Sequence, residues 1–400
     1  MKGRALVAAM SAAQIGSLLP HVVVPAVMPT HLIPAWGLTY GEAGLMAAAY
    51  AAGYMVAVPV LTTLTDRIDA RRILLWGSVV SGLSTIAFGL FAQGLVSAIM
   101  LWGLAGIGFA GAYMPGLKAL TDRLDPGESS RSITVYTASF SVGVGVSFLV
   151  SQLVAQWWGW REAAIVTGLG PAAMAFVAST LRPVPPPPPS GKMLDFRPVF
   201  ANRAALGYIL GYGAHCFELY GMRTWIVAFW GFVTASAGGA APLDAITVSA
   251  AFTLLALPAS VLGNEAAIKF GRHRAIATVM VCSALVALAI GLTAGFSPWL
   301  TLALVACYAF TLPADSGALT SGMSGAADPR FRGATLALHS TVGFALSALG
   351  GWGVGLALDA AGGATTATGW TAAFAVMAAG IALGPLALWW SRRAWESGRA

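Results

Sequence analysis

Apolar runs of transmembrane length, separated by short polar stretches, repeat along the whole chain. Such runs are typical of helices that cross a bilayer, whose hydrocarbon core needs about 20 apolar residues. A β-barrel would instead alternate polar and apolar residues at every second position, and this pattern is absent. We predict an all-α membrane protein with twelve transmembrane helices in two six-helix bundles. The predicted spans are 5–34, 42–65, 71–92, 96–121, 130–155, 162–182, 203–234, 243–269, 273–295, 298–325, 331–358 and 368–391.

The composition excludes several other classes of protein. Of 400 residues, 58% are hydrophobic and 9% are charged, whereas an average soluble domain has about 25% charged residues. So few charges cannot cover the surface of a soluble protein of this size, which excludes a conventional cytosolic enzyme. The three cysteines all lie inside apolar runs, so we expect buried free thiols rather than disulfides or metal ligands.

Basic residues mark one side of the predicted spans. Of the 22 Lys and Arg, 20 fall at the termini or in loops on the terminal side, while Arg161 falls in an opposite loop and Arg223 inside a span. The positive-inside rule then predicts a multi-pass protein of the inner membrane with both termini in the cytoplasm. The net charge of +7 therefore needs no nucleic-acid partner. The expected partners are a small-molecule solute, protons and the lipid bilayer, and we expect a monomer.

A proline run divides the chain near its midpoint. Pro185 to Pro189 favour an extended conformation and cannot continue a helix. We predict an N-terminal bundle at 1–182, a cytoplasmic linker at 183–202 and a C-terminal bundle at 203–400; a ligand for an SH3-type domain is the alternative reading of the prolines. The halves also repeat weakly, because 69–72 aligns with 271–274 at an offset of 202, and 125–126 aligns with 328–329 at an offset of 203. Duplicated halves are common in secondary transporters.

The loop after the second predicted span resembles the signature loop of the major facilitator superfamily, Gly-x-Leu-Ala-Asp-Arg-x-Gly-Arg-Arg. Thr62 and Asp69 stand where the two signature glycines belong. The matching residues are Leu64, Asp66, Arg67, Arg71 and Arg72. The resemblance implies the major facilitator fold and transport by alternating access.

The same loop is a candidate conformational latch. A carboxylate such as Asp66 can pair with guanidinium groups at the cytoplasmic face, and a few such pairs would hold one state of the transporter. The predicted latch residues are Asp66, Arg67, Arg71 and Arg72. The alternative is that these charges only mark topology.

Two further segments bear on the sub-family. Met114-Pro115-Gly116 at the end of span four and Gly159-Trp160-Arg161 at the start of span six resemble the cyanate-type and nitrate-type porters and their organic-anion relatives. Span five contains 143–147, Gly-Val-Gly-Val-Ser, without the Gly-Pro signature that drug–proton antiporters of the superfamily usually carry there. This favours an anion porter over a drug antiporter.

Few ionisable residues lie inside the predicted spans, which makes each a candidate for function, because a charge in the bilayer is costly. Glu218 in span seven and Asp315 in span ten lie near mid-depth. We predict that they couple transport to protons, since burial favours the neutral form of a carboxyl group and exposure to water favours the charged form.

The predicted substrate contacts combine one cation with polar aromatic side chains. A guanidinium can hold a carboxylate through two hydrogen bonds, so Arg223 is the expected anchor for an anionic solute. The alternative is a static pair between Arg223 and Glu218 or Asp315 that only locks the helices. The full predicted set is Arg223, His21, His215, Tyr220 and Tyr54.

Motifs for nucleotide binding, metal binding and catalysis are missing from the sequence: there is no Walker loop, no His-Glu-x-x-His and no Cys pair. We therefore expect no enzyme activity, no cofactor and no metal, and a driving force from an ion or solute gradient. The leading hypothesis is a proton-coupled secondary transporter of a small anionic organic solute. A proton-coupled efflux antiporter for drugs or cations and a transporter-like solute sensor remain as alternatives.

Overall fold

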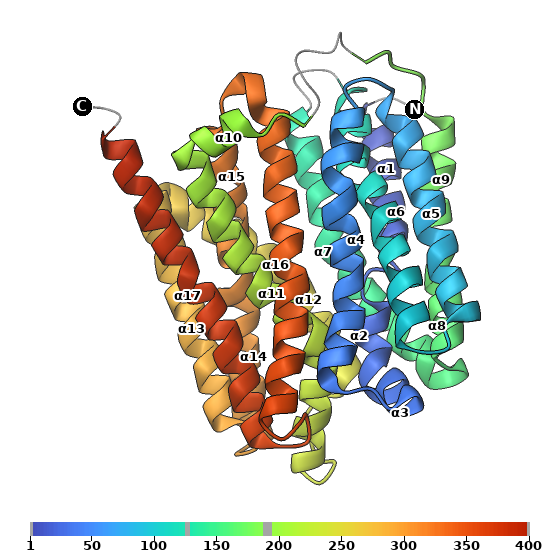
Figure 1. The fold of residues 1–400 in the computed structure, drawn as a ribbon, viewed down its shortest axis with the longest axis vertical. Helices are drawn as coiled ribbons and strands as arrows, with labels where there is room; N and C mark the ends of the chain where they lie inside the picture. Colours follow the sequence, from blue (N-terminus) through green and yellow to red (C-terminus); the bar gives the residue numbers. More distant parts are fainter. Residues whose placement is uncertain (1–2, 125–128, 187–193, 398–400) are drawn as a thin grey trace. The chain divides into compact units, whose positions relative to one another are not determined.

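The computed structural model describes residues 3–124, 129–186 and 194–397, and every element of regular structure in these ranges is a helix (Figure 1). Two segments of the sequence analysis lie outside the described residues: 125–126, which align with 328–329 in the internal repeat, and 187–193 of the predicted linker. The all-α class predicted from the apolar runs is confirmed.

Ten helical stretches of the described chain are long and apolar enough to cross a membrane, which supports a multi-pass membrane protein. Each coincides with one of the twelve predicted spans. They are α4 (Tyr40–Leu64), α5 (Ala70–Phe91), α6 (Leu95–Thr121), α7 (Ser129–Trp158), α8 (Trp160–Gly168) with α9 (Pro171–Thr180), α12 (Ala245–Phe270), α13 (Arg272–Thr293), α14 (Pro298–Thr311) through α15 (Ser316–Ala326), α16 (Arg332–Ala360) and α17 (Ala367–Ser397).

The other two predicted spans are helical but differ from these ten, so the count of twelve stays a prediction. The seventh corresponds to α11 (Arg203–Ser236), a helix of 34 residues whose polar, aromatic and glycine residues lower its mean hydropathy. The first is divided among shorter elements: α1 (Gly3–Ser17), α2 (Val23–Val27), the π-helix η1 (Met28–Leu32) and α3 (Ile33–Trp36).

The break between α1 and α2 follows from Pro20, which has no amide hydrogen to donate. The groups freed there are bound by a side chain from α7. The hydroxyl of Ser147, which is fully buried, donates to the carbonyl of Leu19 (2.5 Å) and accepts from the amide of Val22 (3.3 Å). A serine in the middle of α7 thus stabilises an interrupted helix at a depth where water is scarce.

Contacts between residues divide the chain into two compact units. The first comprises Met1–Val27 and Ala49–Asp195, and the second comprises Met28–Ala48 and Phe196–Ala400. In the first unit α5 packs mainly against α6, α8 and α9, and in the second α11 packs mainly against α16 and α17.

The start of α4 belongs to the second unit, where a carboxylate binds its first amides. Asp359, near the end of α16, accepts hydrogen bonds from the amides of Tyr40 (2.9 Å) and Gly41 (2.7 Å). These amides belong to the first turn of α4, where the helix dipole favours a negative charge.

The tenth predicted span bends at its middle. The 3₁₀ segment η2 (Leu312–Asp315) joins α14 to α15 and contains Pro313 in its first turn. Helix α12 approaches this bend so closely that a Cβ added at Gly263 would collide with the carbonyl oxygen of Ala314. The glycine therefore allows the contact that holds the bend.

Candidate functional site

Glu218 is the most deeply buried acid of the second unit. It lies near the middle of α11 and is 0% exposed. Its Oε1 atom accepts hydrogen bonds from the hydroxyl of Ser283 in α13 (2.8 Å) and from the hydroxyl of Tyr308 in α14 (2.9 Å). In the part of the chain that the structure describes, its Oε2 atom has no hydrogen-bond partner. One carboxylate oxygen is thus held by two helices, while the other is left for a proton or a ligand.

One turn earlier on α11, His215 contacts the second predicted acid. Its Nδ1 atom lies 2.7 Å from Oδ1 of Asp315, and both side chains are at most 2% exposed. The angles at these two atoms are not those of a hydrogen bond. The contact is therefore an ion pair whenever His215 is protonated. The bend at η2 places Asp315 against α11, so the structure brings together two residues that the sequence analysis singled out separately.

Two further aromatic side chains extend this pair toward α16. The ring of Tyr212 stacks on His339 (centroids 3.9 Å apart, planes at 22°) and lies 5.7 Å from the ring of His215. His339 is 3% exposed. Neither Tyr212 nor His339 is among the predicted site residues, although Tyr212 lies three residues before His215 and so shares its helix face.

Arg223 lies further along α11 and is 6% exposed. Its guanidinium lies 5.0 Å from the ring centroid of Tyr220 and hydrogen-bonds to this side chain. Among the described residues, no carboxylate lies within ion-pair distance of Arg223. The static pair with Glu218 or Asp315, considered as an alternative above, is not observed. A buried cation without a carboxylate is costly, so a bound anion would stabilise it.

His21 and Tyr54, the remaining predicted contacts, belong to the first unit and lie in an aromatic cluster there. His21 is 4% exposed, and its ring centroid lies 5.2–5.3 Å from those of Tyr50, Phe109 and Phe140. Tyr54 packs against the same Phe109, at 5.7 Å. These two residues therefore share one aromatic cluster of the first unit.

The loop between α4 and α5 is organised by Asp69 rather than by the expected Asp66. Asp69 accepts hydrogen bonds from Arg123 (2.9 and 3.0 Å) and from the amides of Arg71 (3.0 Å) and Val184 (2.9 Å). Burial raises the pKa of Asp69. The hydrogen bonds and the charge of Arg123 together lower this pKa by more than burial raises it, so it lies below its usual 3.8. This carboxylate connects the loop to the start of the linker.

The other predicted latch residues occupy exposed positions. Asp66, Arg67 and Arg72 are exposed, and among the described residues they form no ion pair. Partial burial raises the pKa of Asp66, Lys118 lowers it in part and Asp122 raises it. Arg71 alone of the predicted set joins the cluster around Asp69, at 3.2 Å. Asp69 was not predicted as a latch residue because it stands at a position where the signature has a glycine.

The comparisons with known proteins agree with this architecture. The sequence family described as Major Facilitator Superfamily matches residues 6–351. A protein of Chlamydia muridarum, named as a probable hexose phosphate transport protein, is 24% identical over 150 residues, which cover 38% of this chain and 32% of that protein. A protein of Cupriavidus necator, named as the probable sulfoacetate transporter SauU, is 26% identical over 132 residues, covering 33% and 30%. The aligned region thus spans about a third of each relative.

Solved structures share the fold over nearly the whole chain. A bacterial homologue of the human lysosomal transporter Spinster, in an inward-facing and occupied conformation, has a TM-score of 0.78 at 17% identity and covers 97% of this chain and 96% of its own. A point mutant of the nucleoside transporter NupG has a TM-score of 0.73 at 13% identity, covering 96% and 98%. The match across 346 consecutive residues, together with this shared fold, shows that the chain belongs to the Major Facilitator Superfamily.

Proposed function

We propose that this protein is a secondary transporter that moves a small anionic organic solute across the inner membrane by alternating access, coupled to protons. The observation that carries the proposal is that Arg223 is buried and has no carboxylate within ion-pair distance among the described residues. It is 6% exposed, and its contact in the described chain is the neutral side chain of Tyr220. A carboxylate, sulfonate or phosphate on the solute would supply the negative charge that the helix does not.

The proposed proton carrier is Glu218. Because its Oε1 is held by Ser283 and Tyr308, the carboxyl group keeps a fixed orientation in both protonation states. Protonation at Oε2 removes the charge from a site that is 0% exposed. The negative charge of Asp315 can be balanced by a protonated His215, whereas among the described residues Glu218 has no basic side chain within ion-pair distance. We therefore assign coupling first to Glu218 and a supporting role to the His215–Asp315 pair.

The names of the aligned relatives support an anionic solute. Hexose phosphates and sulfoacetate differ in size and chemistry, but both carry a negative charge that a guanidinium can bind. This common property, rather than either compound, is what we transfer to the chain.

The test is binding and flux with the purified protein. A hexose phosphate, sulfoacetate and a panel of small carboxylates are screened for a rise in the midpoint of thermal unfolding, because a ligand that binds the folded state stabilises it. We expect binding to be lost in Arg223→Gln and kept in Arg203→Gln, a matched change at an exposed arginine of the same helix. If Arg223→Gln binds the anion as the unchanged protein does, Arg223 is excluded as its anchor, and if no anion of the panel raises the midpoint, the proposal of an anionic solute fails.

The alternative functions give different results in the same preparation. An efflux antiporter for organic cations would use the free oxygen of Glu218, so cation binding would survive Arg223→Gln and fail in Glu218→Gln. A solute sensor would bind its ligand without moving it across the membrane of proteoliposomes.

A further inference from the structure

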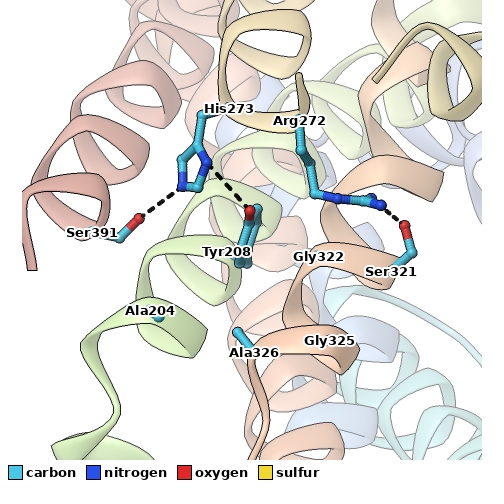
Figure 2. Close-up of a pocket in the computed structure, with 9 residues that line it drawn as sticks. All are labelled: Ala204, Tyr208, Arg272, His273, Ser321, Gly322, Gly325, Ala326 and Ser391. Atoms are coloured by element: carbon cyan, nitrogen blue, oxygen red, sulfur yellow. Dashed lines mark hydrogen bonds between the residues drawn. The ribbon is translucent and has the colours of Figure 1, made fainter. Parts of the chain in front are cut away.

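A polar cavity lies in the second unit, at the end of α17 that leads to the C-terminus (Figure 2). Its volume is about 220 Å³, well above the roughly 10–15 Å³ that one water molecule requires. It is lined by Ala204, Tyr208, Arg272, His273, Ser321, Gly322, Gly325, Ala326 and Ser391. The cavity thus combines one permanent cation, one histidine and three hydroxyl groups with small residues that leave space.

The permanent charge of this lining is on Arg272, which has no carboxylate partner in the part of the chain that the structure describes. Arg272 donates to the carbonyl of Ala318 (2.8 Å), to Oδ1 of Asn264 (3.4 Å) and to the hydroxyl of Ser321. All three acceptors are neutral, and no carboxylate of the described chain lies within ion-pair distance of Arg272. Arg272 is also the first residue of α13, whose N-terminus has no side-chain cap. The positive end of the helix dipole adds to its charge.

Two buried hydroxyl groups complete the lining. Tyr208 is 7% exposed and its oxygen lies 3.4 Å from Nδ1 of His273. Ser391 is 1% exposed and its oxygen lies 3.5 Å from Nε2 of the same ring. Figure 2 shows His273 between these two hydroxyls. Both contacts are long for hydrogen bonds, so the hydroxyl of Tyr208 can turn toward a stronger acceptor at small cost, whereas that of Ser391 also donates to the carbonyl of Leu388 (2.9 Å).

The internal repeat explains why this place is open. At the offset of 202, Gly271 aligns with Asp69, and at the offset of 203, Ala326 aligns with Arg123. In the first unit, the aligned residues Asp69 and Arg123 form an ion pair (2.9 Å). In the second unit a glycine and an alanine stand at the aligned positions, so this ion pair is missing there, and Ala326 lines the cavity.

A second contact supports this alignment. The Gly-Trp pairs at 159–160 and 369–370 align Leu181 with Ser391, and the offset of 202 aligns Arg71 with His273. Arg71 donates to the carbonyl of Leu181 (2.7 Å), and His273 contacts Ser391. The aligned positions are therefore in contact in both halves, through a backbone carbonyl in the first and a side-chain hydroxyl in the second, and in the described chain a carboxylate, Asp69, lies beside the contact in the first half.

We propose that this cavity binds a phosphate group, which takes the place that Asp69 occupies in the first unit. Phosphate oxygens accept hydrogen bonds from guanidinium and hydroxyl groups and are favoured at helix N-termini. Two sources have this chemistry: the headgroup of an anionic phospholipid, for which basic pockets between transmembrane helices are known sites, and soluble phosphate.

The test uses the full chain purified in a maltoside detergent, which contains no phosphate. In one arm inorganic phosphate is compared with chloride at equal ionic strength, and in the other phosphatidylglycerol is added to the micelles. The readout is the rise in the midpoint of thermal unfolding as a function of ligand concentration. Four variants are compared with the unchanged protein. Arg272→Gln removes the cation, and Ala326→Leu fills the cavity and keeps every donor. Arg274→Gln removes an exposed arginine outside the lining, and Arg223→Gln removes the cation of the site on α11.

We expect a saturable rise in at least one arm, unchanged in Arg274→Gln, lost in Ala326→Leu and weakened about tenfold or more in Arg272→Gln. A rise with inorganic phosphate identifies a soluble ligand, and a rise with phosphatidylglycerol alone identifies a lipid headgroup. The proposal is overturned by the absence of a rise in both arms, by an equal rise in all variants, or by a rise that only Arg223→Gln removes. The last result would place phosphate at the site on α11.

Discussion

Glu218 illustrates what a single acid requires inside an apolar helix bundle. Its side chain is 0% exposed, and two hydroxyl groups from different helices hold one of its oxygens. The sequence indicated Glu218 because charges in a membrane span are rare and costly. It could not indicate Ser283, because a serine in an apolar helix commonly bonds to its own backbone and has no distinctive pattern.

At this scale we predict that Ser283→Ala destabilises the protein by about 1–3 kcal/mol, because it leaves a buried carboxylate oxygen with one hydrogen bond fewer. The midpoint of thermal unfolding measures the loss. Ser78→Ala is the matched control, since this serine is equally buried but bonds only to the carbonyl of Leu74 in its own helix. Equal losses in the two variants would argue against a special bond to Glu218.

Two neighbouring acids in one loop should respond to pH with opposite signs. The pKa of Asp69 is below its usual value in the folded protein, so its stabilisation is present above about pH 4 and is lost as the pH falls through the folded pKa. Asp69→Asn is therefore expected to lower stability at pH 7 and to flatten the loss of stability in acid.

The pKa of Asp66 is raised, chiefly by burial, so its charge costs stability at neutral pH and the cost disappears as the pH falls. Because Asp66 is exposed, Asp66→Asn should change stability at pH 7 little or raise it slightly. Unfolding midpoints of both variants between pH 3 and 8 provide the comparison. Stronger destabilisation by Asp66→Asn than by Asp69→Asn would contradict the assignment of the central carboxylate.

At the scale of elements, the interrupted helices are the features that place functional groups. The break after α1 follows from Pro20, and the hydroxyl of Ser147 satisfies the freed backbone groups. The bend at η2 contains Pro313 and brings Asp315 to His215. A proline pattern predicts where a helix is interrupted, but the partner that stabilises the break depends on packing that the local sequence does not encode.

We predict that Gly263→Ala destabilises the protein by about 1–3 kcal/mol, because the added methyl group would press on the backbone carbonyl of Ala314 and displace η2. Gly325→Ala is the control, since nothing lies within 4 Å of its added Cβ, and alanine should favour the helix by about 0.5–1 kcal/mol. Thermal unfolding of the two variants decides the point. A tolerated Gly263→Ala would mean that the contact between α12 and the bend is loose.

For Ser147→Ala we predict a loss of about 1–3 kcal/mol, because the carbonyl of Leu19 and the amide of Val22 lose their common partner in a buried position. Thr167→Ala provides a comparison, since its hydroxyl is equally buried but bonds within its own helix. The midpoint of thermal unfolding of each variant measures the loss. A loss no larger than that of Thr167→Ala would show that other groups satisfy the break.

At the scale of the whole molecule, the apolar runs predicted the helical class and twelve spans, of which ten correspond to helical stretches of the described chain that are long and apolar enough to cross a membrane. The two predicted spans outside these ten are the ones that hold the most polar or helix-breaking residues. In α11, His215, Glu218 and Arg223 lower the hydropathy, and in the first span four prolines divide the helix. Hydropathy is therefore least able to detect a membrane span in which polar or helix-breaking residues stand in place of apolar ones.

The candidate site was predicted in part, for a similar reason. Charge inside a span indicated Glu218, Asp315 and Arg223, and the structure adds which partners each one has. The contact of His215 with Asp315 joins residues 100 positions apart and depends on the bend at η2, so no local pattern could reveal it.

The most direct measurement of the central claim is proton movement driven by the solute. Proteoliposomes that enclose a pH-sensitive dye are given a gradient of whichever anion the binding screen identifies. We predict that the unchanged protein and Glu265→Gln, a control at an exposed acid of α12, move protons with the solute. Glu218→Gln should still bind and exchange the solute but move no protons. Proton movement by Glu218→Gln at the rate of the unchanged protein would contradict the account.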